Sequence, residues 1–302
     1  MIDTFLSHIY ARNPGQQKKI GAFFARVPEA RTALGNFLTA YNFLWETPEI
    51  GGIAGLAAAY LHVLDEMAYC RVQFTRTGRY PCTSQNAVKE QIYLNSQQML
   101  PHILGLAVSH YLWPAQYQLL EFYKQCVNAQ NTSGRFLEVG SGLGIFASIL
   151  ANHITAKATI DIVDISPVSI AFAQKLLLAT NGPATQQMRF IESDIACHAA
   201  AEPYDFIGMG EVLEHVESPS QILKTLHGLL ADDGFLYLST CANCPAIDHV
   251  YLFHTIEDIR SLIHDSGFRI LRELIAPSEN KPLEYIEKNK LDILYATLLE
   301  KA

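Results

Sequence analysis

The stretch Phe136-Leu-Glu-Val-Gly-Ser-Gly-Leu-Gly144 decides the fold of this 302-residue chain. Its apolar start is typical of a buried β-strand, and the glycines that follow predict a tight turn before a helix that starts near Ile145. Glycine tolerates positive φ angles and lets a ligand approach the backbone, while a helix N-terminus offers free N–H donors. The stretch therefore predicts a site for a nucleotide-like ligand at the end of a strand.

Downstream of this turn, short apolar segments alternate with helical ones, which is the pattern of βαβ units and a parallel sheet. Ser166 and Pro167 predict a helix start, and Thr255 with Asp258 resembles a capping box whose helix ends at Gly267. The last two strands follow each other without a long helix, so one of them should be antiparallel. The expected strands are Phe136–Val139, Ile160–Val163, Arg189–Ile191, Phe206–Met209, Phe235–Ser239, Arg269–Ile275 and Asp292–Leu298.

Up to Val127 the sequence has a helical period and no alternating strand pattern. The apolar stretch Ile50–Leu64 is too short to span a membrane and predicts a buried helix. The polar, turn-rich segment 128–134 is a plausible joint. We expect a helical N-terminal domain over 1–130, acting as a lid, substrate-binding or dimerisation element, and an α/β core over 131–302. Prolines should divide the first domain into several helices, at Pro28, Pro48, Pro81, Pro101 and Pro114.

Composition indicates a globular protein, with 49% hydrophobic and 17% charged residues. The formal charge is −8 and no stretch collects Lys and Arg, so nucleic acid is not expected as a main partner. The N-terminus lacks the pattern of a signal peptide, and we expect a cytoplasmic protein without membrane contact. The six scattered cysteines suit reduced thiols, and Cys241 with Cys244 is interpreted as two small residues after a strand rather than as a zinc site.

Two details of the glycine turn favour one ligand class. The spacing is GxGxG, and Ile145 stands where a dinucleotide-binding fingerprint has its third glycine. Glu138 comes immediately before the turn, where its carboxylate would repel a pyrophosphate but attract a ligand with sulfonium and ammonium groups. S-adenosylmethionine (SAM) is such a ligand. A nicotinamide-dependent oxidoreductase is disfavoured on both counts.

Two more acids follow later strands. Asp164 ends the second strand, where a carboxylate can accept hydrogen bonds from both ribose hydroxyls of an adenosine cofactor. Asp194 ends the third strand and can accept from the adenine amino group. Each acid also has an ordinary structural interpretation, Asp164 as a turn residue and Asp194 as a helix N-cap. All these positions fall at the carboxyl ends of successive strands, where open α/β sheets bind ligands.

The segments FLEVGSGLG, VDIS, ESDI, YDFIGMGEVLEHV and LLADDGFLYLST, in this order, resemble the core of class I SAM-dependent methyltransferases. The resemblance covers about the last 170 residues. It implies a Rossmann-like, seven-stranded sheet with its last strand antiparallel. It also implies that Glu138 and the glycines lie near the methionine part of SAM, Asp164 near the ribose and Asp194 near the adenine. The predicted cofactor-binding residues are Glu138, Gly140, Ser141, Gly142, Gly144, Asp164, Ile165, Asp194, Ile195 and Glu211.

The segment Glu211-Val-Leu-Glu-His215 follows the fourth strand and should lie beside the transferred methyl group. As a helix it would place Glu211 and His215 on one face, with Glu214 adjacent. It resembles ubiquinone-pathway O-methyltransferases and metal-dependent small-RNA 2′-O-methyltransferases, in which a later histidine completes a metal site; here His249 or His254 follows. Many enzymes with this segment use no metal. We predict Glu211, Glu214, His215 and His249 as ligands for Mg²⁺, Mn²⁺ or Fe²⁺, and His215, His249 and Glu214 as the catalytic groups.

The expected activity is methylation of a small molecule, with oxygen slightly favoured as the acceptor atom. Predicted substrate residues are His110, Tyr111, Trp113 and His254, although an aromatic core patch is the alternative interpretation of Tyr111 and Trp113. A homodimer is a further expectation. Two alternatives stay open: a cyclase or alkyl transferase that uses another sulfonium carbon of SAM, and a non-catalytic SAM-binding interaction module.

Overall fold

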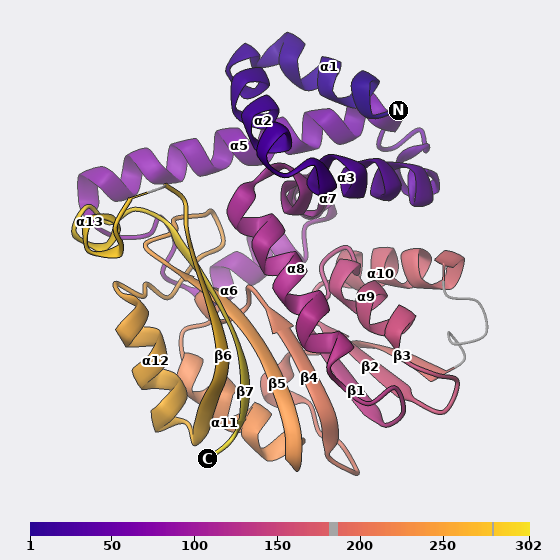
Figure 1. Cartoon of the computed structure of the whole chain (residues 1–302), viewed down its shortest axis with the longest axis vertical. Helices are drawn as coiled ribbons and strands as arrows, with labels where there is room; N and C mark the ends of the chain where they lie inside the picture. The colour runs from indigo at the N-terminus through magenta and orange to yellow at the C-terminus, as the bar shows by residue number, and fades with distance from the viewer. Residues whose placement is uncertain (181–186, 280) are drawn as a thin grey trace.

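The computed structural model describes residues 1–180, 187–279 and 281–302, and shows a set of helices followed by a twisted sheet (Figure 1). The sheet has the order β3-β2-β1-β4-β5-β7-β6, and β7 runs antiparallel to both of its neighbours. The predicted Rossmann-like α/β sheet with an antiparallel last strand is therefore confirmed. Its strands are β1 (Arg135–Val139), β2 (Thr159–Asp164), β3 (Met188–Glu192), β4 (Tyr204–Gly210), β5 (Leu230–Ala242), β6 (Phe268–Pro277) and β7 (Ile293–Lys301).

The N-terminal region is helical, as expected. Its helices are α1 (Ile2–Arg12), α2 (Pro14–Arg26), α3 (Pro28–Ala40), α4 (Asn42–Trp45), α5 (Gly52–Thr77), α6 (Gln85–Val88), the π-helical turn η1 (Lys89–Tyr93), α7 (Ser96–Leu112) and α8 (Pro114–Asn128). The helices of the α/β region are α9 (Ile145–His153), α10 (Pro167–Thr180), η3 (Ile195–Cys197), η4 (Leu213–His215), α11 (Pro219–Leu229), α12 (Ile256–Asp265) and α13 (Leu283–Lys288).

Side chains of the central strands alternate between two buried faces. On β1, Phe136 packs into a core with residues of α8, α9 and α10, whereas Leu137 and Val139 pack into a second core with α11 and α12. Figure 1 shows these helices arranged around the sheet. Because both faces are covered, the strands are nearly continuous apolar runs, which is why the sequence locates them well.

Helix α7 joins the N-terminal helices to the sheet. A Cβ on its Gly105 would lie 2.5 Å from the carbonyl oxygen of Ala59 on α5, so glycine permits the close crossing of the two helices. The expectation that Pro101 ends a helix is wrong, because α7 continues through it. Pro101 has no N–H group to donate to the carbonyl of Gln97, so one helical hydrogen bond is missing. Gln97 lies at the exposed start of the helix.

The local helix signals behave as predicted. Thr255 Oγ1 accepts from the Asp258 N–H, and the Asp258 carboxylate accepts from the Thr255 N–H, so the capping box of α12 is present. Gly267 follows that helix with a φ of 84°, a conformation that glycine adopts at low cost. Pro167 begins α10 directly after Ser166.

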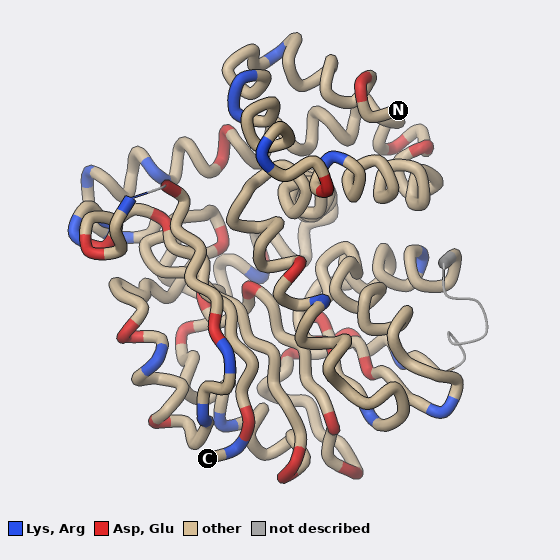
Figure 2. Tube along the Cα trace, viewed as in Figure 1, with Lys and Arg blue, Asp and Glu red and all other residues tan. Residues whose placement is uncertain are grey.

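Helical structure gives way to α/β structure between Asn128 and Arg135. One continuous apolar core nevertheless joins the N-terminal helices to α8, α9, α10 and the sheet, so the division into two domains stays a prediction. Figure 2 shows Lys and Arg distributed over many elements of the described chain. Among the described residues, no helix has the length and apolarity that crossing a membrane requires.

Candidate functional site

The glycine turn follows β1 and requires its glycines. Gly140, Gly142 and Gly144 have φ angles of 72°, 49° and 93°, which L side chains rarely adopt. The Gly140 N–H donates to the carbonyl oxygen of Val163 at 2.9 Å and so ties the turn to β2. A Cβ on Gly140 would lie 2.4 Å from Val212 Cγ2. The turn therefore presents a backbone edge that any larger residue would displace.

Asp164 ends β2 and is held against this turn. Its Oδ2 accepts from the Gly142 N–H at 3.1 Å and from Ser141 Oγ at 3.3 Å, and its Oδ1 accepts from the Ser166 N–H at 2.8 Å. Burial raises the pKa of Asp164 to about 6, although these hydrogen bonds favour the charged form. The result is a pre-positioned carboxylate at the strand end that can accept hydrogen bonds from a ligand.

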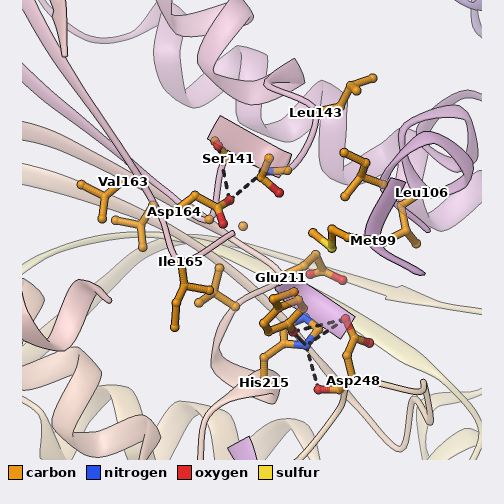
Figure 3. Close-up of a pocket in the computed structure, with 18 of the residues that line it drawn as sticks. Met99, Leu106, Ser141, Leu143, Val163, Asp164, Ile165, Glu211, His215 and Asp248 are labelled. Atoms are coloured by element: carbon orange, nitrogen blue, oxygen red, sulfur yellow. Dashed lines mark hydrogen bonds and ion pairs between the residues drawn. The ribbon is translucent and has the colours of Figure 1, made fainter. Parts of the chain in front are cut away.

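A cavity opens at the carboxyl ends of β1, β2 and β4, and α7 closes its other side (Figure 3). Asp194 lies on its wall, where its Oδ1 accepts from the Ala196 N–H at 2.9 Å and caps η3. Of the predicted cofactor-binding residues, the cavity wall includes Gly140, Ser141, Gly142, Asp164, Ile165, Asp194, Ile195 and Glu211. Eight of the ten predicted cofactor-binding residues therefore line one cavity.

Glu138 is not among the residues that line the cavity, and its contact with the cofactor stays a prediction. Its side chain lies on the same face of β1 as Phe136, beneath the turn, and its Oε2 accepts from the Tyr123 hydroxyl at 2.9 Å. Burial raises the pKa of Glu138 to about 8, and the Tyr123 hydrogen bond partly opposes this shift. Glu138 therefore supports the turn from α8's side of the sheet.

Glu211, another predicted cofactor-binding residue, lines the cavity, whereas Glu138 does not. It follows β4 with a φ of 54°, and its carboxylate faces the cavity (Figure 3). Its Oε1 is buried and has no hydrogen-bond partner among the described residues. Burial, followed by the nearby Glu214, holds the pKa of Glu211 well above its usual range. A buried, unpartnered carboxylate oxygen of this kind favours a cationic ligand group.

His215 lies on the cavity floor, where a polar network fixes its ring (Figure 3). Its Nδ1 is 3.0 Å from the Tyr93 hydroxyl, 3.0 Å from the Asp248 carbonyl oxygen and 3.4 Å from Asp248 Oδ2. Asp248 Oδ2 also makes a 3.3 Å ion-pair contact with His102 Nε2. Burial opposes ionisation of Asp248, yet these histidines hold its pKa well below its usual range. Because Nδ1 is occupied, Nε2 is the nitrogen of His215 available to a substrate.

Three of the four predicted metal ligands lie near one another. A ligand atom of His249 lies within 4.8 Å of one on Glu214, in a group with Cys241, and of one on His215, in a group with Asp248, whereas Glu211 belongs to neither group. The segment is helical only over the turn Leu213–His215, and the left-handed backbone of Glu211 precedes this turn, so the shared helix face considered for Glu211 and His215 does not form. As a result, Glu211 and His215 face the cavity, whereas Glu214 and His249 are buried away from its wall. Of the three predicted catalytic groups, His215 lines the cavity, whereas Glu214 and His249 do not.

Four other predicted site residues lie elsewhere. A Cβ on Gly144 would press on Ala173 of α10, so this glycine permits helix packing rather than lining the cavity. Tyr111 stacks on Phe37, and Trp113 donates from Nε1 to the Tyr60 hydroxyl at 2.9 Å, as expected for a core patch. His254 stands before α12 and does not reach the cavity, whereas His110 does line it.

The side of the cavity formed by η1 and α7 was not predicted from the sequence. This wall includes Tyr93 and His102, together with the apolar residues Met99, Ile103, Leu106 and Ala107. They belong to a helical region that matches no motif, and a four-residue apolar spacing such as Met99–Ile103 is equally typical of a core helix. Only their contacts with the strand ends identify them.

Comparisons with known proteins identify the family of this chain. A family profile described as a methyltransferase domain matches residues 112–273, which is more than half of the chain. A ubiquinone biosynthesis O-methyltransferase from Actinobacillus pleuropneumoniae serotype 5b (strain L20) is 34% identical over 119 residues, covering 37% of this chain and 49% of that protein. The chain thus spans about half the length of this curated relative.

Solved structures share the fold at lower identity. The mitomycin 7-O-methyltransferase superposes with a TM-score of 0.55 and 13% identity, covering 83% of this chain and 70% of that chain. The magnesium protoporphyrin IX methyltransferase from Synechocystis PCC 6803, solved with bound SAM, gives a TM-score of 0.53 and 22% identity over 72% of this chain and 99% of that chain. At these identities the likeness concerns the fold alone.

Proposed function

This chain belongs to the methyltransferase-domain family, as a class I SAM-dependent member, and we propose that it methylates an oxygen atom of a small molecule. One observation carries the proposal. The cavity at the strand ends combines a carboxylate that accepts hydrogen bonds, Asp164, with a buried and unpartnered carboxylate oxygen, on Glu211. Asp164 can accept hydrogen bonds from ribose hydroxyls, and Glu211 can pair with a positively charged amino acid group. SAM contains a ribose and such a group. The name of the O-methyltransferase relative favours oxygen as the acceptor atom.

The residues around the cavity fit SAM from end to end. The backbone of Gly140 and Gly142 would hold the methionine part, Glu211 its positive charge, and Asp164 the ribose hydroxyls. Asp194 would accept from the adenine amino group. SAM supplies a methyl group already bonded to its leaving group, so the protein needs to align the acceptor, exclude water and remove a proton.

The acceptor side of the cavity favours a small, largely apolar molecule. Met99, Ile103 and Leu106 of α7 form an apolar wall opposite the glycine turn, and His110 adds one polar group. A phenol or a similar acidic hydroxyl compound matches such a surface, because its ring can pack on α7 while its hydroxyl faces His215. Binding to a homodimer partner, and the cytoplasmic location, stay predictions.

His215 is the proposed general base. Asp248 and Tyr93 hold its Nδ1, so Nε2 can accept the proton of an acceptor hydroxyl as the oxygen attacks the methyl carbon. Asp248 is proposed as a positioning residue, since its carboxylate and carbonyl both orient the ring. A metal ion held by Glu211, Glu214, His215 and His249 stays a prediction.

Replacing Gly140 with alanine should weaken SAM binding roughly tenfold, because forcing an L residue into this left-handed turn costs about 1–2 kcal/mol. The added Cβ would also meet Val212. Calorimetry with SAM measures the effect. The matched control is Gly228→Ala on α11, where an added Cβ has open space and no strained φ. Equal affinities for the two variants would contradict the proposed role of the turn.

SAM affinity should fall as the pH drops through about 6, because only ionised Asp164 accepts hydrogen bonds with both oxygens. Its pKa lies near 6 without ligand, and ligand hydroxyls favour the charged form, so protons compete with the ligand. We expect the Kd to rise by up to ~10-fold per pH unit well below pH ~6 as Asp164 becomes protonated. Asp164→Asn should remove this dependence. A wild-type Kd that improves toward low pH would contradict the assignment.

Product analysis tests the proposed reaction. Purified protein is incubated with SAM and matched pairs of phenols and anilines, and the products are identified by mass spectrometry. O-methylation predicts S-adenosylhomocysteine together with the methyl ether of the phenol, and little product from the aniline. Methylthioadenosine would instead indicate a cyclase or alkyl transferase. SAM binding without turnover across a broad panel would indicate a non-catalytic module.

A further inference from the structure

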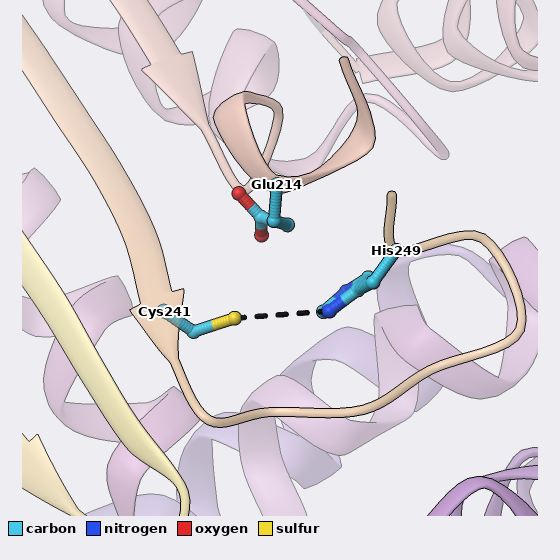
Figure 4. A group of neighbouring side chains, drawn as sticks. All are labelled: Glu214, Cys241 and His249. Atoms are coloured by element: carbon cyan, nitrogen blue, oxygen red, sulfur yellow. Dashed lines mark hydrogen bonds between the residues drawn. The ribbon is translucent and has the colours of Figure 1, made fainter. Parts of the chain in front are cut away.

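Behind the cavity floor, three side chains that can bind metal meet from separate segments. Glu214 comes from η4, Cys241 from the end of β5, and His249 from the loop between β5 and α12 (Figure 4). One ligand atom of each lies within 4.8 Å of the other two. Glu214 and Cys241 are fully buried and His249 is 7% exposed. None of the three lines the cavity.

The carboxylate of Glu214 is incompletely paired. Its Oε2 accepts from Thr240 Oγ1 at 2.7 Å, but its Oε1 is buried without a hydrogen-bond partner among the described residues. Arg71, the guanidinium that reaches this loop, is bonded to the Asn243 carbonyl and to Asp292 instead. A buried carboxylate oxygen without a partner is costly, and a bound cation would satisfy it.

A backbone contact orients the histidine beside the cysteine. His249 Nδ1 lies 2.5 Å from the Cys244 carbonyl oxygen, and this contact fixes the orientation of the ring. The same nitrogen is 3.8 Å from Cys241 Sγ. The thiol of Cys244 is a hydrogen-bond neighbour of the Cys241 thiol. A second sulfur therefore stands beside the three residues.

We propose that Glu214, Cys241 and His249 bind one Zn²⁺ ion. Sulfur, nitrogen and carboxylate oxygen together form a ligand set that zinc accepts in four-coordinate sites, whereas Mg²⁺ and Mn²⁺ disfavour thiolates. Binding releases the Cys241 thiol proton to solvent and changes no oxidation state.

The position of the site indicates its role. Glu214 precedes His215 in the chain and His249 follows Asp248, so one ion would tie together the two segments that carry the proposed base and its positioning residue. Because its ligands are buried and lie outside the cavity, the ion is structural and does not touch the substrate. The inference is independent of the proposed reaction.

Metal analysis tests the site. The full chain is purified without a metal-affinity resin and its zinc content is measured by mass spectrometry. We expect about one zinc per chain, and a loss of most of it in Cys241→Ser and in His249→Gln. Cys197→Ser, which changes an exposed thiol, and Cys70→Ser, which changes a buried thiol on α5, are the matched controls and should keep their zinc.

Reconstitution with Co²⁺ tests the site in the wild-type protein, so the result does not depend on whether a variant folds. Wild-type protein reconstituted with Co²⁺ should show a thiolate-to-metal charge-transfer band, and its melting temperature should fall when the metal is chelated. A folded wild-type protein that contains no zinc, shows no such band with Co²⁺ and melts at the same temperature with chelator would overturn the site. Zinc retained in both ligand variants would overturn it too. SAM binding and methyl transfer by a zinc-free protein would leave the proposed function intact.

Discussion

His215→Asn should lower kcat by about 100- to 10,000-fold, the usual contribution of a positioned general base. The Kd for SAM should stay within about twofold, because the predicted cofactor contacts come from the turn and from Asp164. The loss follows from the geometry, in which Asp248 and Tyr93 occupy Nδ1 and leave Nε2 to the acceptor. Single-turnover kinetics with a phenolic acceptor, together with SAM calorimetry, measure both quantities.

His264→Asn is the matched control, since His264 is exposed on α12 and should be dispensable. Asp248→Asn should give a smaller fall in kcat, because the Asp248 backbone carbonyl and Tyr93 would still orient the ring. If the His215 variant keeps its full kcat at saturating substrate, His215 is not the base.

Asp164→Ala should raise the Kd for SAM by about 100-fold or more, the second large effect. Hydrogen bonds to a charged acceptor contribute about 1.5–3 kcal/mol each, and the carboxylate is positioned to accept two. Part of the loss comes from the protein itself, because Asp164 also holds the Gly142 N–H and Ser141. Calorimetry with SAM and a thermal melt of the free protein separate the two contributions.

Asp164→Asn keeps the shape of the side chain and removes its charge, so its affinity should fall between that of wild type and that of the alanine variant. Asp233→Ala is the matched control, because Asp233 is exposed near the start of β5 and lies far from the carboxyl ends of the strands. Wild-type affinity in Asp164→Ala would mean that the ribose is not held at the end of β2.

The fold was predictable because its signals are local. Strand residues such as Phe136 and Ile160 lie in apolar runs buried on both faces, and the start of α10 and the capping box of α12 are encoded within four residues. Pro101 was the exception. Its cost to α7 is one hydrogen bond, which tertiary packing outweighs.

The cofactor side of the site was also predictable, because strand ends of a parallel sheet meet at one edge. That rule alone predicted that Asp164 and Asp194 lie at the site. The direction of individual side chains was not predictable from spacing. Glu138 turns under the strand toward Tyr123, and Glu214 turns away from its neighbour His215 because Glu211 breaks the helix. Tyr93 on η1, a partner of His215, and His102 on α7, a partner of Asp248, come from a distant part of the sequence that has no motif.

Calorimetry of the wild-type protein with S-adenosylhomocysteine and, separately, with NADH tests the central claim most directly. The cavity's acids predict one binding site per chain for the adenosine thioether and no measurable heat with the anionic dinucleotide. Tight binding of NADH, with no heat from S-adenosylhomocysteine or SAM, would contradict the assignment of this cavity.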